Sequence, residues 1–473
     1  MMGDGAEFQG PWTGDGATIE QLFEQCAARL NLLANQHAVE VELLVEKAEV
    51  FSLSVQKSEL EKYESSSSQC AGLRVLKDGY PGHAWTEEVS VSALERAFEQ
   101  ALENAEFTAL SKDESLKVSL IEDSPPGTVG TSLPLANDSP AMVSVEEKIE
   151  RARLLERVAL EHDPRVLSVP HSGYTESQSE AYLWNSRGVR RRQGRSSVSG
   201  RCSVLVKDGD GARMGAEAFF ARDARRVDVR EVARDGARKA LAKLGAKPPK
   251  TGRYPVVLES QVAAEIIGLV ASGFSAKEVF EKNSLFAGRL WTVVAGPELT
   301  LIDDPHLEDG LGSRAFDGEG AWTSRTPLIE AGVLKAFVTD SVHSKRMGLP
   351  HTAHAARSAR SELGVGFSNL VVFPGTEPLE ALLNRYPRVI LITEFKGYHA
   401  GYQGRSGDFS FESEGELWEN GNRVGPLCNF VTSGNVKDLL LAIEAVGARY
   451  APRVSSIVSP DLLIRELTIA GVD

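Results

Sequence analysis

The sequence has few cysteines: Cys26, Cys70, Cys202 and Cys428 are the only ones among 473 residues, and they lie far apart. No CxxC pair is present, which excludes a cysteine-rich zinc module, and the wide spacing excludes a compact disulfide framework. We expect these residues to be buried or incidental thiols in the reducing environment of the cytoplasm.

Long hydrophobic runs are also missing. The most apolar stretch, 256–274, is interrupted by Glu259 and Glu265, and the runs at 389–392 and 439–446 are too short to cross a bilayer. Residues 1–18 are polar and rich in glycine, with neither a positively charged n-region nor an apolar h-region. The sequence therefore predicts a cytoplasmic protein without membrane contact, preceded by a disordered leader over 1–18.

An excess of positive charge is absent too. The chain has 52 Lys and Arg residues against 66 Asp and Glu residues, and a net charge of -14. This acidic balance disfavours non-specific binding of nucleic acid, because the phosphate backbone is itself negative. The basic run at 187–195 is interpreted as a solvated strand and turn. With 42% hydrophobic and 25% charged residues, the composition is that of a globular protein of two or three domains.

Several motifs that would define a site are missing. There is no GxxxxGK loop and no GxGxxG after a strand, since Gly364-Val-Gly366 and Gly318-Glu-Gly320 are typical of turns. No GxSxG elbow occurs, so the sequence gives no case for a serine hydrolase. No HExxH motif occurs either.

Periodicity predicts an α+β unit in the first part of the chain. Apolar residues at helical spacing predict helices over 19–35 and 91–105, and β-rich segments at 39–45 and 50–56 predict two paired strands. A further strand at 72–76 enters Lys77-Asp78-Gly79, where Asp-Gly supplies the positive φ of a tight turn. We expect an N-terminal α+β domain over 19–122.

A stretch rich in Pro, Ser and Gly predicts a linker over 123–141. Behind it, Ser144 and Glu147 form a capping-box pattern at the start of a helix that runs to about 162. Strands are expected at 166–172, 179–185 and 203–207, and a helix at 229–244. These elements predict a middle α+β domain over 142–248.

From 249 to 473, short β-rich stretches alternate with turns that contain glycine, and helices are expected only at 261–272 and 436–446. Many strands at short spacing predict a large antiparallel, barrel-like sheet. The expected fold class is therefore α+β, with an N-terminal α/β portion followed by a large strand-rich C-terminal domain.

Residue patterns for metal binding are weak. His351 and His354 have i, i+3 spacing, and His399 lies in a Gly-rich loop, so three imidazoles could hold zinc with one position open. The segment 350–360 is polar, however, and typical of an exposed loop. Acidic residues in turns are interpreted as solvated: Asp303, Asp304, Asp317 and Glu319.

The segment 262–273 has an apolar face at helical spacing, formed by Val262, Ile266, Leu269 and Val270, and predicts a core helix. Glu265 is the one charge within it. A position facing the surface explains this glutamate.

Sequence blocks in a specific order cover nearly the whole chain, from about 39 to 471. They are Gly72-Leu-Arg-Val-Leu-Lys-Asp-Gly79, Asn185-Ser-Arg-Gly188, Asp317-Gly-Glu-Gly320, Arg325-Thr-Pro-Leu-Ile-Glu-Ala-Gly-Val-Leu334, Ser368-Asn-Leu370, Pro374-Gly375, Gly404-Arg-Ser-Gly-Asp-Phe-Ser410, Trp418-Glu-Asn-Gly421, Ser433-Gly-Asn-Val-Lys-Asp-Leu439 and Leu467-Thr-Ile-Ala-Gly471. In this order and spacing, the chain resembles the TldD/PmbA (TldE) family of modulators and metallopeptidases.

The resemblance implies an N-terminal α+β portion and a strand-rich C-terminal domain, assembled as dimers. In the TldD branch of the family, a helix carries HExxxH, whose two histidines bind zinc together with a later cysteine. The glutamate of that motif activates the water bound to the metal. The implied substrate is an unfolded oligopeptide, added as a strand to an exposed edge inside the cavity of the dimer.

Residue by residue, the motif falls on 264–269, with its glycine at Gly268. Glu265 matches the general base, but Ala264 and Leu269 stand at the two histidine positions, and the cysteine segment falls on 454–456 (Val-Ser-Ser). Alanine and leucine cannot bind zinc, and a serine hydroxyl is a poor replacement for a thiolate. The resemblance is therefore to the PmbA (TldE) branch, which lacks the zinc site and pairs with a TldD-like partner. We expect no metal and no catalytic residue in this chain.

The resulting hypothesis is a non-zinc-binding subunit of a cytoplasmic TldD–TldE-type metallopeptidase complex that degrades or trims unfolded oligopeptides, such as leader peptides. No cofactor is expected in this chain, and zinc is expected in the TldD-like homologue with which it forms a heterodimer. Four residues in or beside the Gly-rich loops are candidates for contacting the peptide: Glu394, His399, Asp408 and Asn435. A role in shaping turns explains them equally well.

Two alternatives remain open. The first is a stand-alone peptide-binding protein without catalysis. The second is an autonomous metallopeptidase whose relocated metal site is formed by His351, His354 and His399. Co-purification with an HExxxH-bearing homologue, with activity only in the mixture, would separate the heterodimer from both.

Overall fold

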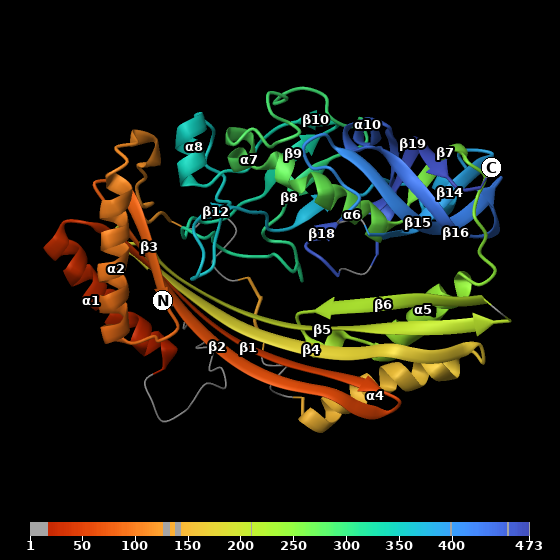
Figure 1. The fold of residues 1–473 in the computed structure, drawn as a ribbon, viewed down its shortest axis with the longest axis horizontal. Helices are drawn as coiled ribbons and strands as arrows, with labels where there is room; N and C mark the ends of the chain where they lie inside the picture. Colours follow the sequence, from red (N-terminus) through yellow and green to blue (C-terminus); the bar gives the residue numbers. More distant parts are fainter. Residues whose placement is uncertain are drawn as a thin grey trace, which may run out of the picture.

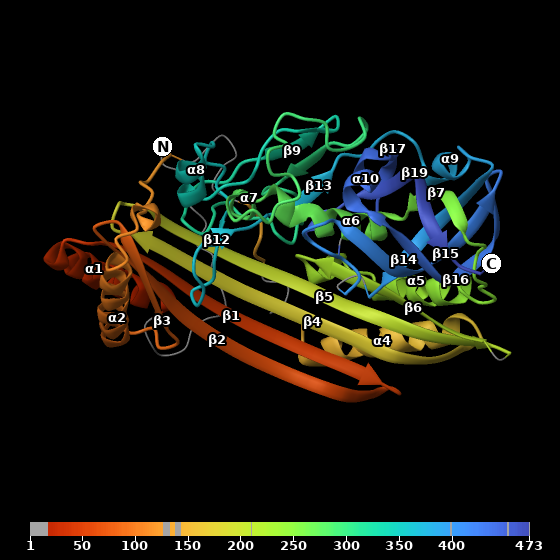
Figure 2. The same cartoon turned by 45° about the horizontal axis from the view of Figure 1, so that its top comes forward.

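The computed structural model describes residues 18–125, 133–137, 143–209, 211–397, 400–451 and 454–472. They form a long, curved six-stranded sheet and a strand-rich C-terminal part that lies over one face of this sheet (Figure 1). Figure 2 shows the long strands running side by side beneath the C-terminal part. The predicted α+β fold class with a strand-rich C-terminal domain is confirmed.

The long sheet combines two stretches of chain that are far apart in the sequence. Its strands have the order β3-β2-β1-β4-β5-β6, and all neighbours are antiparallel. Their bounds are β1 Glu40–Gln56, β2 Glu59–Lys77, β3 Tyr80–Thr86, β4 Val166–Asn185, β5 Arg190–Asp208 and β6 Gly211–Ala221. Because β1 pairs with β4, the segments 19–122 and 142–248 share one sheet. The boundaries between the predicted domains stay predictions.

Helices cover one face of the long sheet, with α1 and α2 at one end and α4 and α5 nearer the other (Figure 1). Side chains alternate along a strand, which fixes this arrangement. Leu43 of β1 is buried with α1 and α2, whereas the next residue, Leu44, packs with Phe316 and Ala359 of the C-terminal part. We call the helix-covered side the outer face and the side turned toward the C-terminal part the inner face.

Side-chain caps define where several helices begin. Thr18 and Gln21 form a capping box at α1, and the Glu147 N–H donates to Ser144 Oγ at 3.2 Å at the start of α4, where the capping pattern predicts a helix. The helix bounds are α1 Ile19–His37, α2 Val91–Ala109, α4 Val145–His162, α5 Val229–Ala242, α6 Ser260–Ala271, α7 Ala276–Phe280, α8 Ser341–Met347, α9 Leu379–Leu383 and α10 Val436–Leu441, with short 3-10 turns η1 Glu114–Leu116, η2 Ala224–Arg226 and η3 Ser272–Phe274.

The main C-terminal sheet has the order β16-β15-β14-β7-β19-β17. Its strands are β7 Gly252–Leu258, β14 Arg388–Lys396, β15 Asp408–Glu419, β16 Asn422–Asn435, β17 Ile443–Tyr450 and β19 Pro460–Ala470. A further pairing between β16 and β19 closes five of these strands into a ring, so the sheet is barrel-like, and only β7 and β14 run parallel to each other. Helix α6 packs against β7, β14 and β19.

A second, five-stranded C-terminal sheet has the order β10-β9-β8-β13-β18, and β11 pairs with β12 beside it. The bounds are β8 Leu301–Asp303, β9 Thr326–Glu330, β10 Val333–Leu334, β11 Ala355–Ala356, β12 Gly364–Val365, β13 Leu370–Val372 and β18 Ile457–Val458. Loops from this region reach the inner face of the long sheet. There, a Cβ on Gly72 of β2 would lie 2.1 Å from the Ala359 carbonyl oxygen, so only glycine fits this backbone approach.

Three local predictions need correction. Segments 39–45 and 50–56 belong to the single strand β1, and segments 166–172 and 179–185 belong to the single strand β4. The polar residues between them end neither strand, because pairing with neighbouring strands continues through them. The helix expected over 436–446 ends at Leu441, since Ile443 to Val446 pair with β19. The turn at Asp78-Gly79 is confirmed, with φ of 51° and 85°.

The basic run at 187–195 is not uniformly solvated. The Arg191 side chain is 6% exposed: its Nε donates to the Gly320 carbonyl at 3.0 Å, and it pairs with Asp123 at 2.7 Å and lies over the Trp322 ring. The interpretation as a solvated strand and turn is therefore wrong for Arg191.

Parts of two predicted segments fall outside the described residues. These are positions 1–17 of the expected leader, and 126–132 and 138–141 of the expected linker. Among the helices that the structure describes, none is both long enough and apolar enough to span a membrane.

Candidate functional site

Helix α6 carries the degenerate motif, and its first residue ties it to the barrel. The Ser260 N–H donates to the Asp461 carboxylate at 2.9 Å, and the Ala451 N–H donates to Ser260 Oγ at 3.0 Å. Ser260 Oγ in turn donates to the Ser459 carbonyl. The apolar face of the helix, including Ile266, is buried. The core helix expected over 261–272 is confirmed.

The structure brings the motif segments together, but without metal ligands. A Cβ on Gly268 would lie 3.0 Å from the Ile457 Cδ1 atom, so the segment just before Ile457 adjoins α6. At the two histidine positions, Ala264 and Leu269 offer a methyl group and an isobutyl group, and the segment 454–456 (Val-Ser-Ser) offers hydroxyl groups but no thiol. Zinc binds imidazole, thiolate and carboxylate groups. The residues present at this position therefore do not fit a zinc ion.

Glu265 is half-buried, and its Oε2 atom has no hydrogen-bond partner among the described residues. Burial, and to a smaller degree the Glu394 carboxylate, raise the pKa of Glu265 to about 7. Glu265 is therefore a partly buried carboxyl group rather than a fully solvated one. Without a zinc ion, it would have no metal-bound water to deprotonate.

The raised pKa of Glu265 makes stability depend on pH. The folded protein holds a proton that the unfolded chain releases between pH 4.5 and about pH 7, so the fold loses stability as the pH rises through this window. We expect Glu265→Gln, which cannot ionise, to gain stability relative to the wild type over this range. Thermal unfolding of both proteins at pH 4.5 and pH 8 measures the change.

Glu99→Gln is the matched control, because Glu99 is exposed on α2. Its melting temperature, taken relative to the wild type, is expected to change much less between the two pH values. An equal change for both variants would contradict the assignment of a buried, proton-binding Glu265.

The peptide-contact candidate Glu394 lies beside Glu265 and forms an ion pair with Lys243, which follows α5. Lys243 also pairs with Glu414 of β15 at 2.8 Å, and Lys396 pairs with Glu414. These ion pairs connect the barrel to the part of the chain that carries α5. A peptide contact by Glu394 stays a prediction.

The candidates Asp408 and Asn435 lie opposite each other on β15 and β16. Asn435 Nδ2 donates to Asp408 Oδ1 at 2.8 Å and to the Ser406 carbonyl at 3.0 Å, and its Oδ1 accepts from the Lys437 N–H at the start of α10. Hydrogen bonds from Asn435 and Ser406 lower the pKa of Asp408. The pair caps a helix and closes a turn, and a role in peptide contact remains a prediction. His399 lies outside the described residues.

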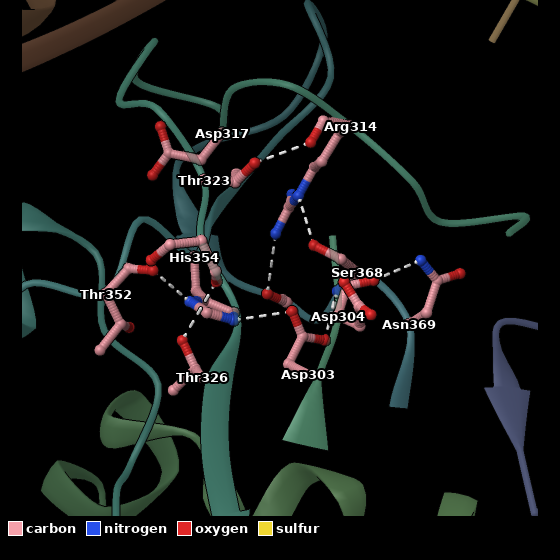
Figure 3. A network of polar contacts seen from close by, with 12 residues as sticks. Asp303, Asp304, Arg314, Asp317, Thr323, Thr326, Thr352, His354, Ser368 and Asn369 are labelled. Carbon is pink, nitrogen blue, oxygen red and sulfur yellow. Dashed lines mark hydrogen bonds and ion pairs between the residues drawn. The ribbon is translucent and has the colours of Figure 1, made fainter. Parts of the chain in front are cut away.

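His354 lies in a buried polar network rather than in an exposed loop (Figure 3). Its Nε2 atom lies 2.9 Å from Asp303 Oδ2, and its Nδ1 atom lies 2.7 Å from the Thr352 carbonyl oxygen. The other oxygen of Asp303 accepts from the Ser368 N–H at 2.8 Å. Both ring nitrogens of His354 are thus engaged within the protein. The third member of the proposed relocated metal site, His399, lies outside the described residues.

The neighbouring Asp304 is also buried, and it organises the same network (Figure 3). Its carboxylate accepts from Arg325 Nε at 2.9 Å, and its carbonyl accepts from Asn369 Nδ2 at 2.7 Å. Asn369 Oδ1 accepts from the Gly312 N–H at 2.9 Å. The interpretation of Asp303 and Asp304 as solvated turn residues is wrong, because their oxygens satisfy buried donors.

Asp317 and Glu319 are buried as well, and their oxygens lie within 4.8 Å of a ring nitrogen of the exposed His351. Asp317 accepts from three backbone N–H groups, and burial and the Glu319 carboxylate raise its pKa to about 7. Glu319 accepts from the Ser341 N–H and hydroxyl. The expectation of solvated acids is wrong here too, and this is the one such group of three potential ligands in the part of the chain described. Its carboxylates are already occupied by structural hydrogen bonds.

A buried cluster of four charged residues joins the long sheet to the C-terminal part. Glu42 of β1 pairs with Arg74 of β2 at 3.1 Å and with Arg357 at 2.7 Å, and Arg74 also pairs with Glu319 at 3.4 Å. All four side chains are at most 7% exposed. We call these residues, Glu42, Arg74, Glu319 and Arg357, the interface charge cluster. Sequence reasoning missed it, although Arg74 is the single charge within the β-rich run 72–76.

Comparison with known proteins gives the class of this fold. Domain models of the PmbA/TldA metallopeptidases match along the chain: domain 1 at residues 41–105, the central domain at 138–244 and the C-terminal domain at 251–471. The fold is that of a PmbA/TldA metallopeptidase. The chain belongs to the PmbA/TldD family, as the sequence blocks predict.

Relatives from both branches of the family are similar over most of their length. The metalloprotease PmbA of Escherichia coli is 27% identical, over 95% of this chain and 96% of its own. A metalloprotease TldD homologue of Haemophilus influenzae is 26% identical, over 85% and 86% of the two chains.

Solved structures agree with this placement. A Thermotoga maritima protein, described as a candidate modulator of a DNA gyrase, superposes with a TM-score of 0.87 at 27% identity, over 95% of this chain and all of its own. TldE of Thermococcus kodakarensis has the same fold, with a TM-score of 0.83 at 24% identity, over 95% of this chain and all of its own.

Proposed function

We propose that this chain is the subunit without zinc in a cytoplasmic two-subunit metallopeptidase that trims unfolded oligopeptides. A TldD-like homologue would be the zinc-bearing subunit. The observation that carries the proposal is the residue set at α6, where Ala264 and Leu269 stand at the two histidine positions of the motif and the segment 454–456 offers no thiol.

The free edge of the long sheet supports assembly with another chain. Residues 59–70 of β2 pair with β1 on one side, and no strand of the described chain pairs with their other side, because β3 ends at Thr86, opposite Ala71. The side chains from Glu59 to Gln69 are exposed on both faces, with Leu60 40% and Tyr63 49% exposed. Unpaired strand edges are covered in most stable proteins. We propose that the partner subunit covers this segment, which we call the open edge of β2.

Metal content and activity test the proposal directly. The chain purified alone without chelator is expected to contain far less than one zinc ion per chain and to show no peptidase activity. Mixed with a TldD-like homologue, it is expected to form a stable complex that cleaves unfolded oligopeptides and loses this activity with a chelator. One zinc ion per lone chain would overturn the proposal.

Glu265→Gln also tests whether this subunit takes part in catalysis. Glu265→Gln in this chain is expected to leave the peptidase rate of the complex within about twofold of the wild type, because the carboxyl group faces no metal-bound water. A loss of many-fold, with assembly intact by size-exclusion chromatography, would show that α6 takes part in catalysis. Peptide binding without activity in any mixture would instead favour a stand-alone peptide-binding protein.

A further inference from the structure

Two cavities lie on the inner face of the long sheet, under loops of the C-terminal part. The first has a volume of about 680 Å³ and is lined by Ser179 and Arg195 of the sheet and by Arg314 and Arg357 from the loops, among others. The second has a volume of about 620 Å³ and reaches Val454. Cavities of this size are typical of ligand sites.

The two cavities lie along the same three strands, β1, β4 and β5. Ala48, Ser179 and Arg195 form one row across β1, β4 and β5 in the first cavity. Ser52, Thr175 and Ser199 form the corresponding row in the second cavity, four residues along each strand. At about 3.3 Å per residue, the rows are about 13 Å apart, which is the length of four residues of an extended peptide.

The row between the cavities consists of small or accessible side chains. Val50, Ser177 and Ser197 stand opposite one another on the inner face, and all three are at least partly exposed. The second cavity also connects this face to the degenerate motif, because Val454 begins the segment that adjoins α6. Along β4 and β5, the row between the two cavities therefore presents only the partly exposed serines Ser177 and Ser197.

Arg195 lines the first cavity and forms no ion pair within the described residues. Its Nε atom is buried and has no hydrogen-bond partner among the described residues, and no carboxylate of the described chain forms an ion pair with it. The three acids that line the cavity have other partners: Glu46 accepts from the Ala359 N–H at 2.7 Å, Glu180 pairs with Arg192 at 3.1 Å, and Asp317 accepts from three backbone N–H groups. An unpaired buried charge is costly, so this arrangement favours a bound anion.

Arg314 adds a second guanidinium to the same cavity, and it too has no ion-pair partner in the described residues. Its three hydrogen bonds go to neutral groups: the Ser368 hydroxyl at 2.9 Å, and the carbonyls of Ala355 and Gly366 at 3.4 and 3.3 Å. Burial, together with the positive charges of Arg222 and Arg314, lowers the pKa of Arg195 to about 10. A negative ligand would relieve this repulsion.

We propose that the inner face of the long sheet holds an extended peptide whose carboxylate is bound by Arg195 and Arg314 in the first cavity. The chain then runs along β4 and β5 toward the second cavity and Val454. Guanidinium groups bind carboxylates through two parallel hydrogen bonds, which fixes the position of the peptide as well as its charge. This inference rests on the proposed function and gives its substrate class: short unfolded peptides with a carboxylate at one end.

Binding of matched peptides to the full chain tests this site. An acetylated pentapeptide of Ala and Ser is titrated by calorimetry as the free acid and as the C-terminal amide. The acid is expected to bind roughly tenfold to hundredfold more tightly than the amide. Arg195→Gln is expected to reduce the affinity for the acid to that for the amide. Arg230→Gln is the control, since Arg230 is exposed on α5 and does not line the cavity, and it should keep the wild-type preference.

Further probes identify the source of the negative charge. An amidated peptide that ends in Asp will match the acid if the cavity accepts any carboxylate, or match the amide if it reads the chain end, and either result supports the site. Equal affinities for acid and amide, a preference that survives Arg195→Gln, or no peptide binding at all would overturn it. Tighter binding of inorganic phosphate than of the acid would also overturn it.

Two checks keep this result separate from the proposed function. Thermal unfolding of Arg195→Gln shows whether the variant is folded, and loss of an unpaired cation is not expected to destabilise it. The peptidase assay of the mixed subunits is scored independently. An active complex whose subunit binds acid and amide equally would overturn only the proposed carboxylate site. An inactive complex would overturn the proposed function.

Discussion

Arg74→Met is expected to lower the free energy of unfolding by about 3–5 kcal/mol, because it breaks a buried charge network on one side only. Arg74 lies between Glu42 and Glu319 at 3.1 and 3.4 Å, and all three side chains are at most 7% exposed. Methionine keeps much of the volume but leaves Glu319 without a cation and Glu42 with Arg357 alone. Urea unfolding of the two proteins, followed by circular dichroism, measures the loss.

Arg253→Met provides the matched control for this experiment. Arg253 also pairs with a glutamate, Glu466, but the two side chains are 69% and 42% exposed, so water screens the pair. The expected loss is below about 1 kcal/mol. A loss of the same small size for Arg74→Met would show that the interface charge cluster does not hold the long sheet to the C-terminal part.

The open edge of β2 is expected to become strongly protected from hydrogen exchange when the partner subunit binds. In the lone chain, the backbone N–H groups of 59–70 that point away from β1 have no strand to pair with, so they should exchange rapidly. If the partner subunit covers this edge, their exchange should slow by about 100-fold or more. Exchange followed by mass spectrometry, on the lone chain and on the complex, gives the comparison peptide by peptide.

Strand β1 serves as the internal control for this measurement. Residues 43–54 pair with β2 on one side and β4 on the other, so their protection should be high before and after assembly. Unchanged exchange over 59–70 in a complex that is demonstrably formed would place the partner elsewhere on the chain. The proposed heterodimer would then stand, but not its contact at the open edge of β2.

The helices were predictable because each carries its own signals. Helix α1 begins at the Thr18 cap and buries Phe23, Cys26 and Leu30, so a prediction over 19–35 is short by only two residues. Strand length was not predictable in the same way. The polar residues 173–178 break the apolar pattern of β4, yet β1 and β5 pair with them on both sides, and only the tertiary partners show this.

The sequence predicted the candidate site at α6 but not the buried polar network around Asp303 and His354. Family blocks located Ala264, Glu265 and Leu269, and their chemistry already indicates a position without zinc. The Asp303–His354 contact joins residues 51 positions apart, and a buried acid in a turn has the same local sequence as a solvated one. Glu42 and Arg74 face each other only through the β1–β2 register, which the structure shows and the sequence does not.

The closed ring of the C-terminal barrel has a consequence for how the chain is made. Strand β7 leaves the ribosome about 200 residues before β19, which pairs with β7, β16 and β17. At ordinary translation rates this interval is about 10–40 s. The other partner of β7, β14, also follows it in the chain, so both edges of β7 are unpaired at first, and one stays unpaired until β19 emerges. A nascent chain with such an edge is prone to aggregate. A chain that stops before β19 cannot close the ring and keeps this edge of β7 exposed.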